Sequence, residues 1–266
     1  MSRLPTLYIP HGGGPCFFMD WTKGPADTWD QMGAWLKGLG QAVGEKPKAL
    51  LIVSAHWEEE DFTVTGAADP DLIYDYYGFP PHTYALTYDA PGSPTLAADV
   101  RDLLSEAGFP SWSDETRGLD HGVFVPFKLV YPEADIPVVQ LSLKAGLEPG
   151  AHVDAGRALA PLRDQGVLIV GSGMSYHNMA GFMAGDAPSG ADVFDRWLTE
   201  TVETDPARRA DRLRHWEDAP AARDAHPREE HLIPLMVAAG AGAEDRGQCI
   251  YSDRVMGAAL SGYRFG

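Results

Sequence analysis

Five of the nine histidines in this sequence lie where an expected strand or loop gives way to a polar turn: His11, His56, His121, His177 and His231. Neutral imidazole is a good ligand for zinc and iron(II). A single-domain protein gathers metal ligands from strand ends that meet at one edge of a sheet. One such histidine is usually an ordinary hydrogen-bonded residue, but the repeated pattern predicts a shared metal site.

Three of these histidines follow apolar segments. His11 opens the turn 12–15, where glycines let the backbone fold tightly around a bulky ligand. His56 closes the apolar run 49–55, and His177 follows a second run that ends in a Gly/Ser turn. Uninterrupted apolar runs of this length are typical of strands buried on both faces. We therefore expect His11 and His56 to supply two metal ligands.

Two regions compete for the third ligand, residues 175–178 and residues 226–231. His231 lies in the first turn of an expected helix and can point back toward the sheet edge. Glu229 and Glu230 are carboxylate alternatives, although acidic residues at a helix start are better explained by the helix dipole.

His121 follows Asp120 and precedes a glycine. It can donate a proton or bind a substrate hydroxyl, whereas Asp120 can equally be a simple cap of the next helix. His226 precedes a proline, which favours a loop without a functional role.

Expected strands and helices alternate along the chain. This order predicts one α/β domain over residues 1–266, with a central, mainly parallel (mixed) sheet flanked by helices on both faces. The segment 69–94, rich in tyrosine, proline and glycine, predicts an ordered aromatic loop. The charged segment 205–230 predicts a partly helical, mobile cover. The expected strands are 6–10, 49–55, 62–66, 137–142, 167–172 and 247–252, and the expected helices 28–43, 94–107, 152–164, 191–204 and 232–240.

Composition excludes several function classes. With 21 basic and 38 acidic residues the formal charge is −17, which disfavours a nucleic-acid partner. Cys16 and Cys249 are too few for a disulfide framework, as expected in a reducing cytoplasm. Neither a membrane-spanning run nor a secretory signal is recognisable, so a cytoplasmic protein without a membrane partner is expected.

Several motifs together resemble one known family. The chain is similar to the DODA-type branch of the class III extradiol ring-cleaving dioxygenases, the LigB-like superfamily. The resemblance spans nearly the whole chain in the expected order. It is carried by His-Gly-Gly-Gly-Pro at 11–15, Ser-Ala-His-Trp at 54–57, Tyr-Asp-Ala-Pro-Gly-Ser-Pro at 88–94, Gly-Leu-Asp-His-Gly at 118–122, Pro-Val-Val-Gln-Leu-Ser at 137–142, Gly-Ser-Gly-Met-Ser-Tyr-His-Asn at 171–178 and Glu-His-Leu-Ile-Pro-Leu at 230–235.

The resemblance implies an enzyme that uses Fe(II) and O2 to open the ring of a catechol, such as DOPA or a related substituted catechol. Zn(II) can occupy the same site in such proteins. The implied metal ligands are His11, His56 and His231. His177 is the implied acid/base residue and a possible further ligand, and His121 is the second pocket histidine.

The resemblance also leaves several points open. Tyr176 is expected to contact the substrate beside His121. The commoner opening of this branch is His-Gly-Ser-Pro, so the extra glycine at 12–14 puts the substrate preference in doubt. The alternative function is a zinc-dependent hydrolase that uses the same histidines to activate water. The partners expected are a small aromatic diol and O2, with the chain acting as a monomer or homo-oligomer.

Overall fold

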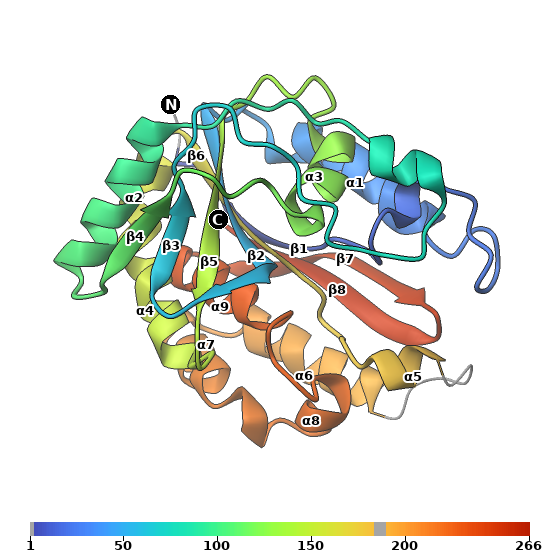
Figure 1. Cartoon of the computed structure of the whole chain (residues 1–266). Helices are drawn as coiled ribbons and strands as arrows, with labels where there is room; N and C mark the ends of the chain where they lie inside the picture. Colours follow the sequence, from blue (N-terminus) through green and yellow to red (C-terminus); the bar gives the residue numbers. More distant parts are fainter. Residues whose placement is uncertain (1–2, 184–189) are drawn as a thin grey trace.

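The computed structural model describes residues 3–183 and 190–266, and its centre is one eight-stranded sheet (Figure 1). The strand order is β4-β3-β5-β2-β6-β1-β8-β7, and the four central strands, β5, β2, β6 and β1, are parallel. The pairs β3–β5, β1–β8 and β7–β8 are antiparallel. The strands are β1 (Thr6–Pro10), β2 (Ala49–Glu59), β3 (Phe62–Thr65), β4 (Ser111–Asp114), β5 (Val138–Lys144), β6 (Val167–Gly173), β7 (Gly247–Val255) and β8 (Ala258–Phe265).

The six expected strands are all present, but two others were missed. β4 is a short polar edge strand, and β8 contains small residues and a glycine, so neither shows the long apolar run that predicts a buried strand. β2 also extends to Glu59, beyond the predicted end. His56 therefore lies inside a strand, near a shift in the pairing register with β5, rather than after it.

Helices cover both faces of the sheet, as predicted. In Figure 1, α1 and α3 lie above the sheet, whereas α4, α6, α7 and α9 lie below it. Among the described residues, no helix is both long and apolar enough to cross a bilayer. The α-helices are α1 (Asp30–Val43), α2 (Pro94–Glu106), α3 (His121–Val130), α4 (Pro149–Leu159), α5 (Met179–Met183), α6 (Ala191–Glu203), α7 (Pro206–Arg214), α8 (Ala222–Ala225) and α9 (Ile233–Ala241); short 3₁₀ helices are Cys16–Phe18, Pro81–Ala85, Ala160–Gln165 and Trp216–Asp218.

Three helical predictions need correction. α3 was missed because it is apolar on nearly all sides and so lacks the polar face of an amphipathic helix. The predicted helix 152–164 begins earlier, with Pro149 in its first turn, and changes to a 3₁₀ helix at Ala160. The segment 205–230 is not a mobile cover, because α7 contacts α4 and α9 and Trp216 is fully buried.

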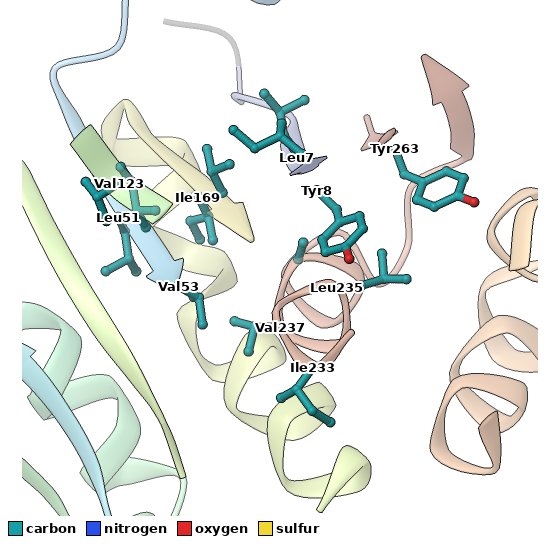
Figure 2. Packing of buried hydrophobic residues seen from close by; sticks show 14 of the residues in the cluster. Leu7, Tyr8, Leu51, Val53, Val123, Ile169, Ile233, Leu235, Val237 and Tyr263 are labelled. Atoms are coloured by element: carbon teal, nitrogen blue, oxygen red, sulfur yellow. The ribbon is translucent and has the colours of Figure 1, made fainter. Parts of the chain in front are cut away.

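Helix α9 packs closely on β6 because β6 ends in glycines. A Cβ atom at Gly171 would collide with the carbonyl oxygen of Pro234, and one at Gly173 with that of His231. The same His231 carbonyl accepts hydrogen bonds from the Tyr8 hydroxyl (2.7 Å) and the Met174 amide (3.1 Å). Figure 2 shows the surrounding core, with Leu235 of α9 close to Tyr8. This packing holds His231 at the carboxyl ends of β1 and β6.

Candidate metal centre

Three histidine side chains meet at the carboxyl ends of the central parallel strands. His11 follows β1, His56 lies in β2, and His231 lies in the turn before α9. One ring nitrogen from each lies within 4.8 Å of the others, and the Nε2 atoms of His11 and His56 are 3.1 Å apart. His11 and His231 are buried, and His56 is half-buried. The arrangement is that expected for a metal site at a sheet edge.

Hydrogen bonds select which nitrogen of two of these histidines is free to bind. The Ser172 hydroxyl donates to the carbonyl of Gly122, so its oxygen is left to accept from His11 Nδ1 at 3.1 Å. His231 Nδ1 donates to Glu230 Oε1 at 2.9 Å. Each ring is thus held with a proton on Nδ1 and a lone pair on Nε2. That is the form in which histidine binds a metal.

The three imidazoles also favour the neutral state. Burial, followed by repulsion from neighbouring histidines, lowers the pKa of His11 and His231 well below the usual value. The same two causes lower the pKa of His56 to about 3. The Nε2 atoms of His11 and His56 lie 3.1 Å apart. A cation bound by both nitrogens would relieve the repulsion between their facing lone pairs.

A carboxylate from the aromatic loop holds His121. Asp75 Oδ1 accepts hydrogen bonds from the His121 amide (3.0 Å) and from His121 Nδ1 (2.8 Å), and Oδ2 lies 3.7 Å from His56 Nδ1. Burial raises the pKa of the Asp75 carboxyl, but the hydrogen bond and charge of His121 outweigh it, so the pKa is lowered. The Asp75 cluster, defined as Asp75, His56 and His121, therefore contains an ionised acceptor.

A second carboxylate holds His177. Glu230 Oε1 lies 2.9 Å from Nδ1 of both His177 and His231. The two imidazole rings are stacked, with centroids 3.4 Å apart. Burial raises the pKa of Glu230, but the hydrogen bond with His177 and other contacts outweigh this and lower it. In this Glu230 cluster, of Glu230, His177 and His231, one carboxylate oxygen contacts both histidines.

A buried polar network positions His121 at the start of α3. Asp120 occupies the N-cap position, but its side chain makes no capping hydrogen bond. Instead its carboxylate accepts from the Ser54 hydroxyl at 2.7 Å and from the Gln140 amide. Burial raises the pKa of Asp120, with repulsion from Asp75 adding to it. The network connects β2 and β5 to α3. Asp120 therefore helps to position His121 through these side-chain hydrogen bonds rather than by capping the helix.

The histidines form the floor of a cavity of about 300 Å³. A cavity of about 150 Å³ holds benzene, so this one accommodates a substituted single ring. Larger hollows of about 700 and 670 Å³ are lined mainly by polar and charged surface residues, without any of the five histidines. Aromatic, methionine and glycine residues form the walls of the histidine cavity: Gly12, Gly13, Gly14, Trp21, Trp29, Tyr76, Tyr77, Phe79, Met174, Met179, Phe182, Met183 and Met256.

The aromatic loop supplies one wall, as an ordered irregular segment. The Tyr76 hydroxyl donates to the Thr83 carbonyl at 2.6 Å, and the Tyr74 hydroxyl to the Leu86 carbonyl at 2.6 Å. The rings of Tyr76 and Phe79 meet edge to face at 5.5 Å, and Tyr76 contacts the His121 ring at 5.8 Å. The loop thus carries both the cavity wall and Asp75.

The structure brings all five singled-out histidines to this cavity, whereas Tyr176 does not line it. The Tyr176 ring lies behind the cavity wall, packed edge to face on Phe182 at 5.1 Å. Glu229 forms an ion pair with Arg223 at 2.5 Å, away from the histidine nitrogens. His226 is fully buried and donates from Nε2 to the Ser175 carbonyl at 3.0 Å. Its place is therefore structural.

Sequence reasoning missed Asp75 and the hydrogen-bonding role of Glu230. Asp75 is one of 38 acidic residues and sits between two tyrosines with no local signal of its partners. Glu230 precedes His231, a candidate ligand, in the sequence, and that adjacency was the signal available. A neighbouring carboxylate commonly orients a ligating histidine through its second nitrogen.

Comparison with known proteins agrees with this geometry. The family described as the catalytic LigB subunit of aromatic ring-opening dioxygenase matches residues 5–263. A 4,5-DOPA dioxygenase extradiol from Beta vulgaris is 44% identical over 245 residues, 90% of this chain and 87% of that protein. The dioxygenase tasH of Hapsidospora irregularis is 37% identical over 284 residues, covering 100% of this chain and 86% of that protein.

A solved structure shares the fold as well. The crystal structure of an uncharacterized protein from Escherichia coli K12 superposes with a TM-score of 0.79 at 29% identity, covering 99% of this chain and 100% of that one. Enzymes of the LigB family are non-haem metal enzymes, in keeping with the buried histidine cluster. The chain belongs to the LigB family of aromatic ring-opening dioxygenases, as a ring-cleaving extradiol dioxygenase of the DODA type.

Proposed function

We propose that this chain is an Fe(II)-dependent extradiol dioxygenase that cleaves the ring of a catechol with O2. The observation that carries the proposal is the set of three neutral imidazole nitrogens, from His11, His56 and His231, that converge on the floor of an apolar cavity. Three neutral ligands leave coordination positions for a diol and O2. Bound Fe(II) would supply the redox chemistry between the ring diol and O2.

His177 is the residue we assign to proton transfer. Its Nδ1 faces Glu230, so Nε2 is the atom left to take the proton of a catechol hydroxyl in the cavity. A histidine is suited to this role because imidazole can both accept and donate a proton through its ring nitrogens. The ionised Glu230 stabilises the imidazolium that forms when the proton is taken.

His121 is the residue we assign to orienting the substrate. Its Nδ1 donates to Asp75, so Nε2 is free to accept from, or when protonated donate to, an oxygen of the bound diol. Tyr76 and Phe79 pack along the ring and exclude water. Tyr176 supports Phe182 from behind, and we propose no direct substrate contact for it.

The domain organisation, location and partners of the chain complete the proposal. We propose that residues 1–266 act as one catalytic domain, as a monomer or homo-oligomer. Both cysteines, Cys16 and Cys249, are free thiols, which supports a cytoplasmic location. The net charge of −17 supports the absence of a nucleic-acid partner.

The test is reconstitution with Fe(II) under nitrogen, followed by addition of O2 and a catechol from a panel that includes DOPA and caffeate. We expect O2 uptake in equal molar amount to substrate and a yellow ring-fission product. A zinc-dependent hydrolase, the alternative use of the same histidines, consumes no O2. Iron-loaded protein that consumes no O2 with any catechol in the panel would contradict the proposal.

A further inference from the structure

The walls of the cavity carry one charged side chain besides the histidines of the floor. Among the described residues that line the cavity, Lys23 alone bears a formal charge at neutral pH, and aspartate, glutamate and arginine are absent. The other wall residues are aromatic, methionine or glycine. A single charge in an otherwise apolar binding cavity typically sets ligand orientation and specificity.

Lys23 is not committed to another group. Its Nζ lies 5.7 Å from the centroid of the Phe79 ring, and it has no ion-pair partner within the ranges that the structure covers. Lys23 also lines the neighbouring groove, together with Asp27, Asp30 and Asp253, but its ammonium group forms no ion pair with these carboxylates. The guanidinium of Arg254 in the same groove is in contrast held by both carboxylate oxygens of Asp192 at 2.6 Å. The ammonium group of Lys23 is therefore available to an incoming anion.

The position of Lys23 suits the far end of a catechol. Lys23 is exposed, as is Tyr77, which is 87% accessible, and both line the cavity, so they mark its mouth. A ring that presents its two hydroxyls to the histidine floor directs a substituent on the opposite edge toward this mouth. In a protein of net charge −17, a carboxylate there would meet repulsion without a local cation.

We propose that Lys23 is a specificity-determining residue, which favours catechols whose side chain ends in a carboxylate over neutral or cationic catechols of the same shape. The inference rests on the proposed function, because it takes the bound ring to be a catechol. It names the substrate class through an ammonium–carboxylate contact at the cavity mouth, beside the Phe79 ring.

The test compares binding of dihydrocaffeate, its neutral amide and cationic dopamine to zinc-loaded protein by calorimetry under nitrogen. These ligands share the catechol ring and differ mainly in side-chain charge, and no turnover is needed. We expect Lys23→Met to weaken dihydrocaffeate binding about tenfold, the effect of losing one charge-assisted hydrogen bond, and to leave amide binding unchanged. Lys23→Arg keeps the charge and should retain the preference.

Lys37→Met is the matched control, because it removes an exposed lysine from α1, outside this cavity. An unchanged ratio of dihydrocaffeate to amide affinity in Lys23→Met, or an equal loss in Lys37→Met, would overturn the assignment of Lys23. Because binding is measured without O2, this result is separate from the test of ring cleavage. Protein that binds the carboxylate selectively and yet consumes no O2 contradicts the dioxygenase proposal alone.

Discussion

The Asp75 cluster and the Glu230 cluster contain the same kinds of residue, but their contacts differ. Each contains one carboxylate, one proposed metal ligand and one further histidine. Glu230 uses a single oxygen for both of its histidines, at 2.9 Å each. Asp75 instead holds His121 with Oδ1 at 2.8 Å, and its Oδ2 is 3.7 Å from His56.

This difference indicates that His121 and His177, which we do not propose as ligands, depend to different extents on the proposed metal ligands. His177 shares a Glu230 oxygen with His231, a proposed ligand, and stacks on its ring. A change at Glu230 should therefore affect both metal binding and the proposed proton-transfer group. His121 depends on a separate oxygen and on the network of Asp120. A change at Asp75 should therefore act mainly on substrate orientation.

The largest expected effects separate ligands from non-ligands within each cluster. His56→Ala and His231→Ala should lose bound metal, because each removes one of the three proposed ligand nitrogens. His177→Ala should keep most of its metal but lower turnover about a hundredfold to ten-thousandfold, the usual contribution of an acid/base group. Metal per chain by mass spectrometry and O2 uptake measure both. Equal metal loss in His177→Ala and His56→Ala would show that His177 is itself a ligand.

The next prediction contrasts the two carboxylates directly. Glu230→Gln should weaken metal affinity about tenfold to a hundredfold, because it removes the charged acceptor of a ligand nitrogen. Asp75→Asn should change metal affinity less and turnover more. Competition with a chelator gives the metal affinity, and initial rates give kcat and KM. Equal changes in metal affinity and in turnover for the two variants would contradict the expected difference between Glu230 and Asp75.

His152, which lies outside both clusters, shows how burial changes the pKa of a histidine that has no hydrogen bond to a carboxylate. His152 bonds only to backbone, at the Lys144 amide and the Glu148 carbonyl. Burial lowers its pKa to about 4, so between pH 6.5 and 4 the unfolded chain binds the extra proton. Stability should therefore fall as pH falls through this range, by at most about 3 kcal/mol from this residue.

Denaturant unfolding of wild type and His152→Gln at several pH values checks this prediction. The glutamine variant should show a shallower loss of stability at acid pH. Parallel pH curves for the two proteins would mean that His152 is not held neutral by burial.

The smallest expected effect concerns Tyr176. Because this ring packs behind Phe182 and does not line the cavity, Tyr176→Phe should change kcat/KM by no more than about twofold. Phe182→Ala is the companion variant, and it should raise KM more because it opens the wall. A large loss of kcat/KM in Tyr176→Phe would instead support the direct substrate contact that the sequence predicts.

The features that sequence could predict are those with a local signature. His11 and His56 each follow a run of apolar residues, and the parallel core that brings them together follows from the alternation of strands and helices. For the third ligand, the sequence left two regions open, residues 175–178 and 226–231. The packing of α9 on β6 places His231 at the sheet edge, and this packing depends on contacts between residues far apart in the chain. Local patterns do not contain such contacts.

The partners of the histidines could not be predicted for the same reason. Asp75 meets His121 across 46 positions of sequence, and nothing near Asp75 distinguishes it from other loop aspartates. His226 has a loop-like sequence but is fully buried, because its Nε2 finds a backbone carbonyl 51 positions away. α3 escaped prediction because a helix buried on all sides lacks the amphipathic period.

We propose that one ion is bound by three Nε2 atoms and that the carboxylates remain hydrogen-bond acceptors. A crystal structure of metal-loaded protein, with the ion located by anomalous scattering, would show the ligands of the ion. We expect one ion bonded to Nε2 of His11, His56 and His231, with Asp75 and Glu230 still bonded to Nδ1 atoms. An ion bonded to the Glu230 or Asp75 carboxylate, in either of the two other groupings that could hold a metal, would contradict it.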